Sequence, residues 1–107
     1  MEFLPENLSS EKFKTILQQH KLVLVDFYAT WCEPCKILDQ ILEDLEPEIH
    51  AVATIIKLDL DQQADLKTAF SIMSVPTLML FKNGELQWRM PGFMLQHELK
   101  EKIFSFC

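Results

Sequence analysis

The chain has 107 residues, 49% of which are hydrophobic, with two glycines and five prolines. This size and composition predict one compact globular domain over residues 1–107 and exclude an intrinsically disordered chain. The net charge of -6, from 10 basic and 16 acidic residues, argues against nucleic acid as a partner.

The N-terminal segment, residues 1–13, is acidic and has no basic region followed by an apolar run. We therefore expect no secretory signal, and a cytoplasmic protein is the default expectation. No stretch approaches ~18 consecutive apolar residues, so we also expect no membrane partner. Three cysteines, an odd number, argue against a secreted scaffold stapled by disulfides.

A short strand at residues 2–4 is the first predicted element. Ser9 or Ser10 can then cap a helix, because a short polar side chain accepts hydrogen bonds from the free amides of a first helical turn. Apolar residues at helical spacing follow, which predicts one buried helix face.

Two continuous apolar runs, "LVLVDFYA" (22–29) and "AVATIIKLDLD" (51–61), are typical of strands covered on both faces. Between them, apolar residues repeat at helical spacing over residues ~34–48, which predicts a helix that ends near Pro47. A strand, a helix of this length and a second strand predict a parallel pair with a right-handed crossover.

The second half of the chain adds a short helix around Leu66. The segment "TLMLFKNGELQWRM" (77–90) then predicts two strands joined by Asn83-Gly84, the strongest short hairpin signal. A closing helix is expected between Leu95 and Phe106. The order βαβαβαββα predicts an α/β fold, a central mixed β-sheet flanked by helices on both faces.

The pair Cys32 and Cys35 stands where the first long strand passes into a helix. Free amides and partial positive charge at a helix N-terminus stabilise a thiolate. Pro34 suits a first helical turn, since its missing N–H would have had no partner there. The spacing of two residues lets the second thiol reach the first and resolve a mixed disulfide. The carboxylate of Glu33 opposes ionisation of Cys32, although its place at the helix start is favourable, and we expect the repulsion to prevail.

A metal site and two inert thiols are the alternatives. Zinc would need a second C-x-x-C or a histidine pair, but His20, His50 and His97 are scattered and Cys107 stands alone. We therefore expect no metal. A C-x-x-C beside a strand–helix–strand pattern indicates redox chemistry.

The segment "VDFYATWCEPCK" (25–36) resembles the active-site segment of the thioredoxin family, whose usual form is W-C-G-P-C-K. "KLDLDQ" (57–62), "VPTLMLFKNGE" (75–85) and "PGF" (91–93) extend the resemblance along most of the chain. It implies the thioredoxin fold and a protein disulfide reductase that works by thiol–disulfide exchange. It further implies protein disulfide substrates, re-reduction by a thioredoxin reductase or equivalent donor, no bound cofactor, and a monomer.

The same resemblance assigns roles to four residues. Cys32 would be the exposed attacking thiol and Cys35 the buried resolving thiol. Asp26 resembles the buried aspartate behind the cysteines, which accepts the proton of the resolving thiol, and Lys57 resembles its buried lysine partner. From the residues alone, the alternative is that Asp26 is a structural charge neutralised by Lys57.

A substrate groove is also implied by the resemblance. Pro76 resembles the cis-proline that faces the disulfide; the alternative is an ordinary trans proline at the start of a strand. Trp31 would flank the site; the alternative is an ordinary core residue. The remaining expected groove residues are Met73, Val75, Gly92 and Phe93.

Glu33 departs from the family pattern, which has glycine there. The Glu-Pro pair also resembles membrane-tethered thioredoxin-like reductants of cytochrome c maturation. Two alternative functions therefore stay open: a dedicated reductant or oxidant of one client protein, and a non-enzymatic binding module. The presence of both thiols disfavours the binding module, which has no need of them.

Overall fold

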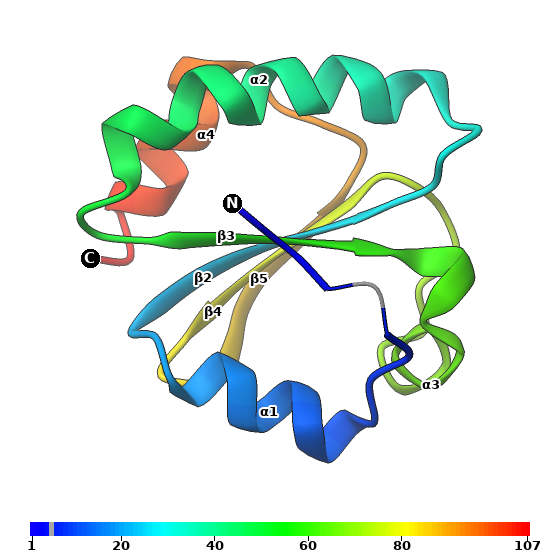
Figure 1. Cartoon of the computed structure of the whole chain (residues 1–107). Helices are drawn as coiled ribbons and strands as arrows, with labels where there is room; N and C mark the ends of the chain where they lie inside the picture. Colours follow the sequence, from blue (N-terminus) through cyan, green and yellow to red (C-terminus); the bar gives the residue numbers. More distant parts are fainter. Residues whose placement is uncertain (5) are drawn as a thin grey trace.

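A five-stranded mixed sheet lies between two layers of helices in the computed structural model, which describes residues 1–4 and 6–107 (Figure 1). In chain order the elements are β1 (Glu2–Phe3), α1 (Ser10–Gln18), β2 (Leu22–Tyr28), α2 (Glu33–Ile49), β3 (Thr54–Asp59), a 3-10 turn η1 (Leu60–Gln62), α3 (Ala64–Ala69), β4 (Thr77–Lys82), β5 (Glu85–Pro91) and α4 (Gln96–Phe104). The predicted α/β order is confirmed. No helix of the described residues has the length and apolar character needed to cross a membrane.

The strand order across the sheet is β1-β3-β2-β4-β5. β3 runs parallel to both β1 and β2, whereas β4 pairs antiparallel with both β2 and β5. Helices α2 and α4 cover one face and α1 and α3 cover the other (Figure 1). The parallel β2–α2–β3 unit predicted from the two apolar runs is confirmed.

Both faces of β2 are buried, which explains its unbroken apolar sequence. Leu22 and Leu24 point into the core beneath α2 and α4, whereas Val23 and Val25 point into the core against α1 and α3. Side chains alternate between the faces of a strand, so Asp26 points toward the α2 side. A carboxyl group is thereby carried into an apolar layer.

Helix α2 ends near Pro47, as predicted. The helix runs to Ile49, and Pro47 lies inside its last turn. A proline removes only its own amide donor, and the amide of His50 still donates to the carbonyl of Glu46 at 2.9 Å. Ile49 is fully buried, so tertiary packing holds the turn that the local rule would have ended.

The hairpin between β4 and β5 turns at Asn83 and Gly84, as predicted. Their φ angles are 52° and 84°, and positive φ at both central residues defines the type I′ turn that fits the strand twist. The amide of Asn83 donates to the carbonyl of Lys21 at 2.8 Å, which ties the turn to the segment after α1.

Replacing Gly84 by alanine should destabilise the fold by about 2 kcal/mol in urea denaturation. Positive φ strains any Cβ, and a Cβ at this position would lie 2.8 Å from Cγ of Gln18. Gly92 is the matched control, because its φ is 87° but a Cβ there meets nothing within 4 Å. Gly92→Ala should therefore lower the free energy of unfolding by only about 1 kcal/mol. Equal losses would show that Gln18 moves aside without cost.

Candidate active site

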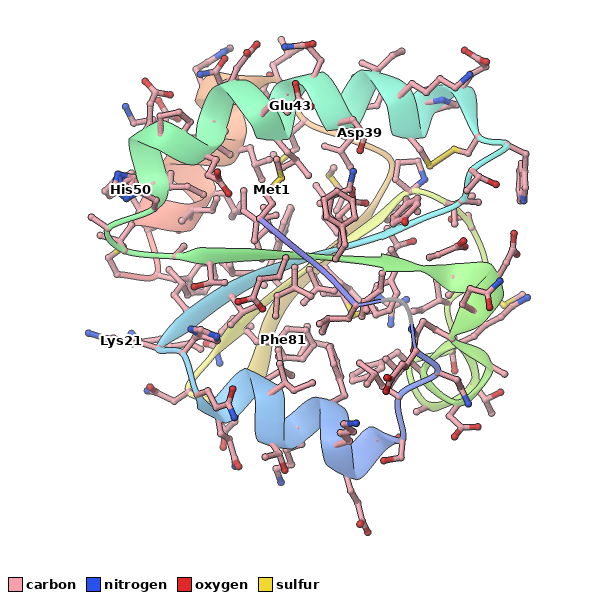
Figure 2. All side chains as sticks on the ribbon, in the orientation of Figure 1. Met1, Lys21, Asp39, Glu43, His50 and Phe81 are labelled. Atoms are coloured by element: carbon pink, nitrogen blue, oxygen red, sulfur yellow. A yellow bond between two sulfur atoms is a disulfide. The ribbon has the colours of Figure 1, made fainter. Side chains whose placement is uncertain are left out.

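The two cysteines of the C-x-x-C form a disulfide at the start of α2, visible as the yellow bond in Figure 2. Cys32 is the N-cap residue of α2, with Pro34 in the first turn. Its Sγ accepts a hydrogen bond from the amide of Cys35 at 3.2 Å. The helix N-terminus is therefore directed at the sulfur of Cys32, where it stabilises negative charge after reduction.

Both cysteines are buried in this oxidised form, with Cys32 4% and Cys35 2% exposed. The burial predicted for Cys35 is confirmed, whereas the exposure predicted for Cys32 is wrong for the disulfide. The bond to Cys35 keeps the Cys32 sulfur in a small cluster with Ala29, against which Tyr28 and Val75 pack.

The loop before β4 supplies the other wall of the site. The peptide bond between Val75 and Pro76 is cis, as the resemblance implied. The carbonyl oxygen of Val75 lies 3.6 Å from Sγ of Cys32. The amide of Gly92 donates to the carbonyl of Pro76 at 2.8 Å, so the segment after β5 is tied to the same loop. Val75, Pro76 and Gly92 thus gather beside the disulfide.

Large apolar side chains are exposed in the segments that carry the site. Trp31 is 70%, Met73 92% and Phe93 37% exposed, so none of the three is a core residue. The indole Nε1 of Trp31 donates to Asp61 at 2.9 Å, which holds the ring next to Cys32. Asp61, in η1, was not singled out from the sequence, because nothing there distinguishes it from the neighbouring Asp59.

Asp26 is fully buried on the face of β2 that α2 covers. Among the residues that the structure describes, no group donates a hydrogen bond to either of its carboxyl oxygens. Burial raises the pKa of Asp26 to about 7, against the opposing effect of the Lys57 charge, and the negative charge of Asp39 raises this pKa further. Near neutral pH the carboxyl group therefore exists in both protonation states.

Lys57 lies directly opposite Asp26 in the parallel register of β2 and β3, but no ion pair joins the two side chains. Its ammonium pairs instead with the carboxylate of Asp39 on α2. The side chain of Asp39 is 41% exposed, so this pair keeps one partner hydrated, whereas pairing with Asp26 would desolvate both charges. Lys57 is thus buried and its charge opposes the rise in the pKa of Asp26, as expected of a partner, whereas the alternative of a neutralised buried ion pair is not formed.

Asp39 is the residue that sequence analysis missed. It lies four positions after Cys35, and residues four apart share one helix face, so this spacing was the available signal. Figure 2 shows Asp39 on α2, above the sheet.

Glu33 is strongly exposed and forms an ion pair with Lys36 at 3.0 Å, one turn along α2. Solvent and the lysine both weaken the field that Glu33 exerts on the Cys32 sulfur. Its expected effect on the thiol is therefore small.

Within residues 1–4 and 6–107, no group of three or more His, Cys, Asp or Glu side chains is placed to hold a metal ion.

Comparison with known proteins decides the family. The sequence model of the Thioredoxin family matches residues 5–105. The chain belongs to the thioredoxin family. Thioredoxin from Staphylococcus saprophyticus is 44% identical over 80 residues, which cover 75% of this chain and 77% of that protein. Thioredoxin from Rickettsia felis is 34% identical over 101 residues, which cover 94% of this chain and 96% of that protein.

Solved structures confirm the thioredoxin fold. A mutant thioredoxin from Halobacterium salinarum superposes with a TM-score of 0.84 at 32% identity, covering 98% of this chain and 90% of that one. Fasciola hepatica thioredoxin also superposes with a TM-score of 0.84, at 28% identity, and the match covers 100% of both chains. With the Cys32–Cys35 pair in place, the chain is a thioredoxin-type protein disulfide reductase that works by thiol–disulfide exchange.

The raised pKa of Asp26 predicts how the stability of an Asp26→Asn variant depends on pH. Between about pH 4 and pH 7 the unfolded chain has lost this proton and the folded chain still holds it, so the wild type loses stability as pH rises through this window. Asparagine does not ionise, so the variant does not lose stability in this way. Its stability relative to wild type should therefore increase by up to about 4 kcal/mol from pH 4 to pH 8.

Urea denaturation of both proteins across this pH range measures the effect. Asp44→Asn is the control, since Asp44 lies on α2, the helix that covers Asp26, but is exposed. A difference between Asp26→Asn and wild type that stays constant with pH would show that Asp26 does not titrate in this window.

Proposed function

We propose that Cys32 is the attacking thiol and Cys35 the resolving thiol of this reductase. The observation that carries the assignment is the hydrogen bond from the amide of Cys35 to Sγ of Cys32 at the N-terminus of α2. The partial positive charge at this helix end favours the thiolate of Cys32. Cys35 lies inside the first turn, where burial disfavours a charge.

In the first step the thiolate of Cys32 attacks one sulfur of a substrate disulfide. The substrate S–S bond breaks, a mixed disulfide forms, and the second substrate sulfur leaves as a thiolate that takes a proton from solvent. In the second step Cys35 loses its proton and attacks Sγ of Cys32. The Cys32–Cys35 disulfide forms, and the remaining substrate sulfur is released as a thiolate. Two electrons pass from the dithiol to the substrate.

Asp26 accepts the proton of Cys35 in the second step. It lies beneath the helix that carries Cys35, and its pKa of about 7 lets it hold or release a proton near neutral pH. Because Lys57 is engaged with Asp39, the carboxyl of Asp26 has no ion-pair partner among the described residues that would keep it ionised.

The substrate lies against the surface around the disulfide. Exposed Trp31, Met73 and Phe93 offer apolar contacts, and the flexible thioether of a methionine adapts to varied partners. Backbone at Val75 and Gly92 can hold an extended substrate segment by strand-like pairing.

A thioredoxin reductase or an equivalent dithiol donor re-reduces the pair, since the dithiol carries only two electrons per cycle. The protein works as a cytoplasmic monomer and needs no bound cofactor, because the electrons arrive through the cysteines themselves. The family supports these partners.

Trapping the intermediate tests the roles of the cysteines. A Cys35→Ser variant, mixed with a peptide that contains a disulfide, should accumulate a mixed disulfide at Cys32, because serine cannot resolve it. Cys32→Ser should accumulate none. Intact-mass measurement detects the adduct, and a Cys107→Ser background removes the third cysteine. Equal adducts in the two variants would reverse or abolish the assignment.

The resolving step tests Asp26. In Asp26→Asn, resolution of a preformed mixed disulfide should be roughly tenfold to hundredfold slower at pH 7. The deficit should shrink at alkaline pH, where Cys35 ionises without help. Stopped-flow measurement from pH 6 to 10 follows the step directly. Wild-type rates at every pH would leave Asp26 as a structural charge only.

A further inference from the structure

The ammonium of Lys57 is held at one place by groups from three elements. It pairs with the carboxylate of Asp39 on α2, and it lies 5.0 Å from the ring centroid of Phe3 on β1 and 4.9 Å from that of Tyr28 on β2. Cation–π contacts with both rings add to the ion pair. Lys57 is only 5% exposed, so the position of its charge is fixed by these three neighbours.

Asp26 is the second carboxyl group that could use this ammonium. Its neighbours in the sheet register are Lys57 on β3 and Leu78 on β4, and Leu78 is apolar. Asp39 on α2 and the phenol of Tyr28 are the other titratable groups whose charges act together with that of Asp26, and Cys35 lies in the first turn of the same helix α2. Two carboxylates thus compete for one buried ammonium, and Asp39 holds it.

We propose that Asp39 is a positioning residue for thiol–disulfide exchange: by binding the ammonium of Lys57, it keeps Asp26 unpaired and ready to accept the proton of Cys35. This rests on the role proposed above for Asp26. Asp39 itself touches neither the substrate nor the reacting sulfurs.

Asp39 acts on Asp26 in two ways, and both raise the pKa of Asp26. It draws the positive charge of Lys57 away, and its own negative charge lies close enough to oppose ionisation of Asp26. Burial is the largest cause of the raised pKa of Asp26, the charge of Lys57 opposes it, and the charge of Asp39 adds to it. Without Asp39, the ammonium would have Asp26 as its carboxylate neighbour in register, and a lysine side chain has the free rotations to turn toward it.

Replacing Asp39 by asparagine tests the proposal. The pKa of Asp26, followed through its carboxyl ¹³C chemical shift in the oxidised protein, should fall by roughly 1–3 units, the usual effect of an opposite charge at close range. The pH at which mixed-disulfide resolution reaches half its maximal rate should move down by the same amount. Asp39 is 41% exposed, so the variant should fold.

Three further variants separate this effect from others. Asp39→Glu keeps a carboxylate for Lys57 and should restore the wild-type titration of Asp26. Glu43→Gln removes the same charge one turn further along α2, as Figure 2 shows, and should leave the titration unchanged. In the double variant Asp39→Asn/Lys57→Met, the pKa of Asp26 should return to a raised value, because the ammonium that lowered it has gone.

An unchanged Asp26 titration in Asp39→Asn, or an equal shift in Glu43→Gln, would overturn the proposal. The proposal is also overturned if the pKa of Asp26 shifts in Asp39→Asn but the pH dependence of mixed-disulfide resolution does not shift with it. These results are distinct from failure of the proposed acceptor, which shows as wild-type resolution in Asp26→Asn. If Asp26→Asn is slow and Asp39→Asn leaves both readouts unchanged, Asp26 is the acceptor and Asp39 has no part in positioning it.

Discussion

A carboxyl group enclosed in an apolar layer is the constraint on which the chemistry of this molecule depends. Asp26 has lost its water, and no hydrogen-bond donor among the described residues replaces it. An ionised carboxylate is therefore unfavourable there, yet a group that never ionises could not accept a proton. Near neutral pH both forms of Asp26 are populated, which is the condition that proton transfer requires.

The topology of the sheet explains why this carboxyl group lies near the cysteines. β2 is a central strand, and its carboxyl end leads directly into α2, whose first residues carry the disulfide. The antiparallel pairing of Phe27 with Thr77 brings the start of β4 to the same end, and with it Val75 and Pro76. Two segments that are distant in sequence, residues 26–35 and 75–77, meet because one strand has these neighbours. Sites at the carboxyl ends of strands are common in sheets of this kind.

Local signals explain what could be predicted from the sequence. The start of α2, the hairpin at Asn83-Gly84 and the double burial of β2 each depend on residues that are close together in the chain. The end of α2 near Pro47 is also predicted, and the packing of buried Ile49 carries the helix just past the proline.

The parts of the site that sequence missed depend on the direction of single side chains. The register predicts that Lys57 lies opposite Asp26, and it does. Which carboxylate receives its ammonium depends on the rotation of α2 over the sheet, which brings Asp39 within reach. In the sequence, Asp39 is one of several acidic residues of α2, and its spacing of four residues from Cys35 does not reveal that its carboxylate reaches Lys57. The burial of Cys32 likewise follows from the direction of its bond to Cys35.

The placement of the ion pair shows how the fold can keep an unfavourable group. Lys57 is buried whichever carboxylate it meets, so the difference in free energy lies in the partner. Asp39 remains partly hydrated and needs little desolvation, whereas an ionised Asp26 would be buried together with the lysine. The more favourable pair therefore forms at the edge of the core and leaves the interior carboxyl unpaired. In the proposed mechanism, a residue that lowers the stability of the folded chain thereby supplies a proton acceptor whose pKa lies near the working pH.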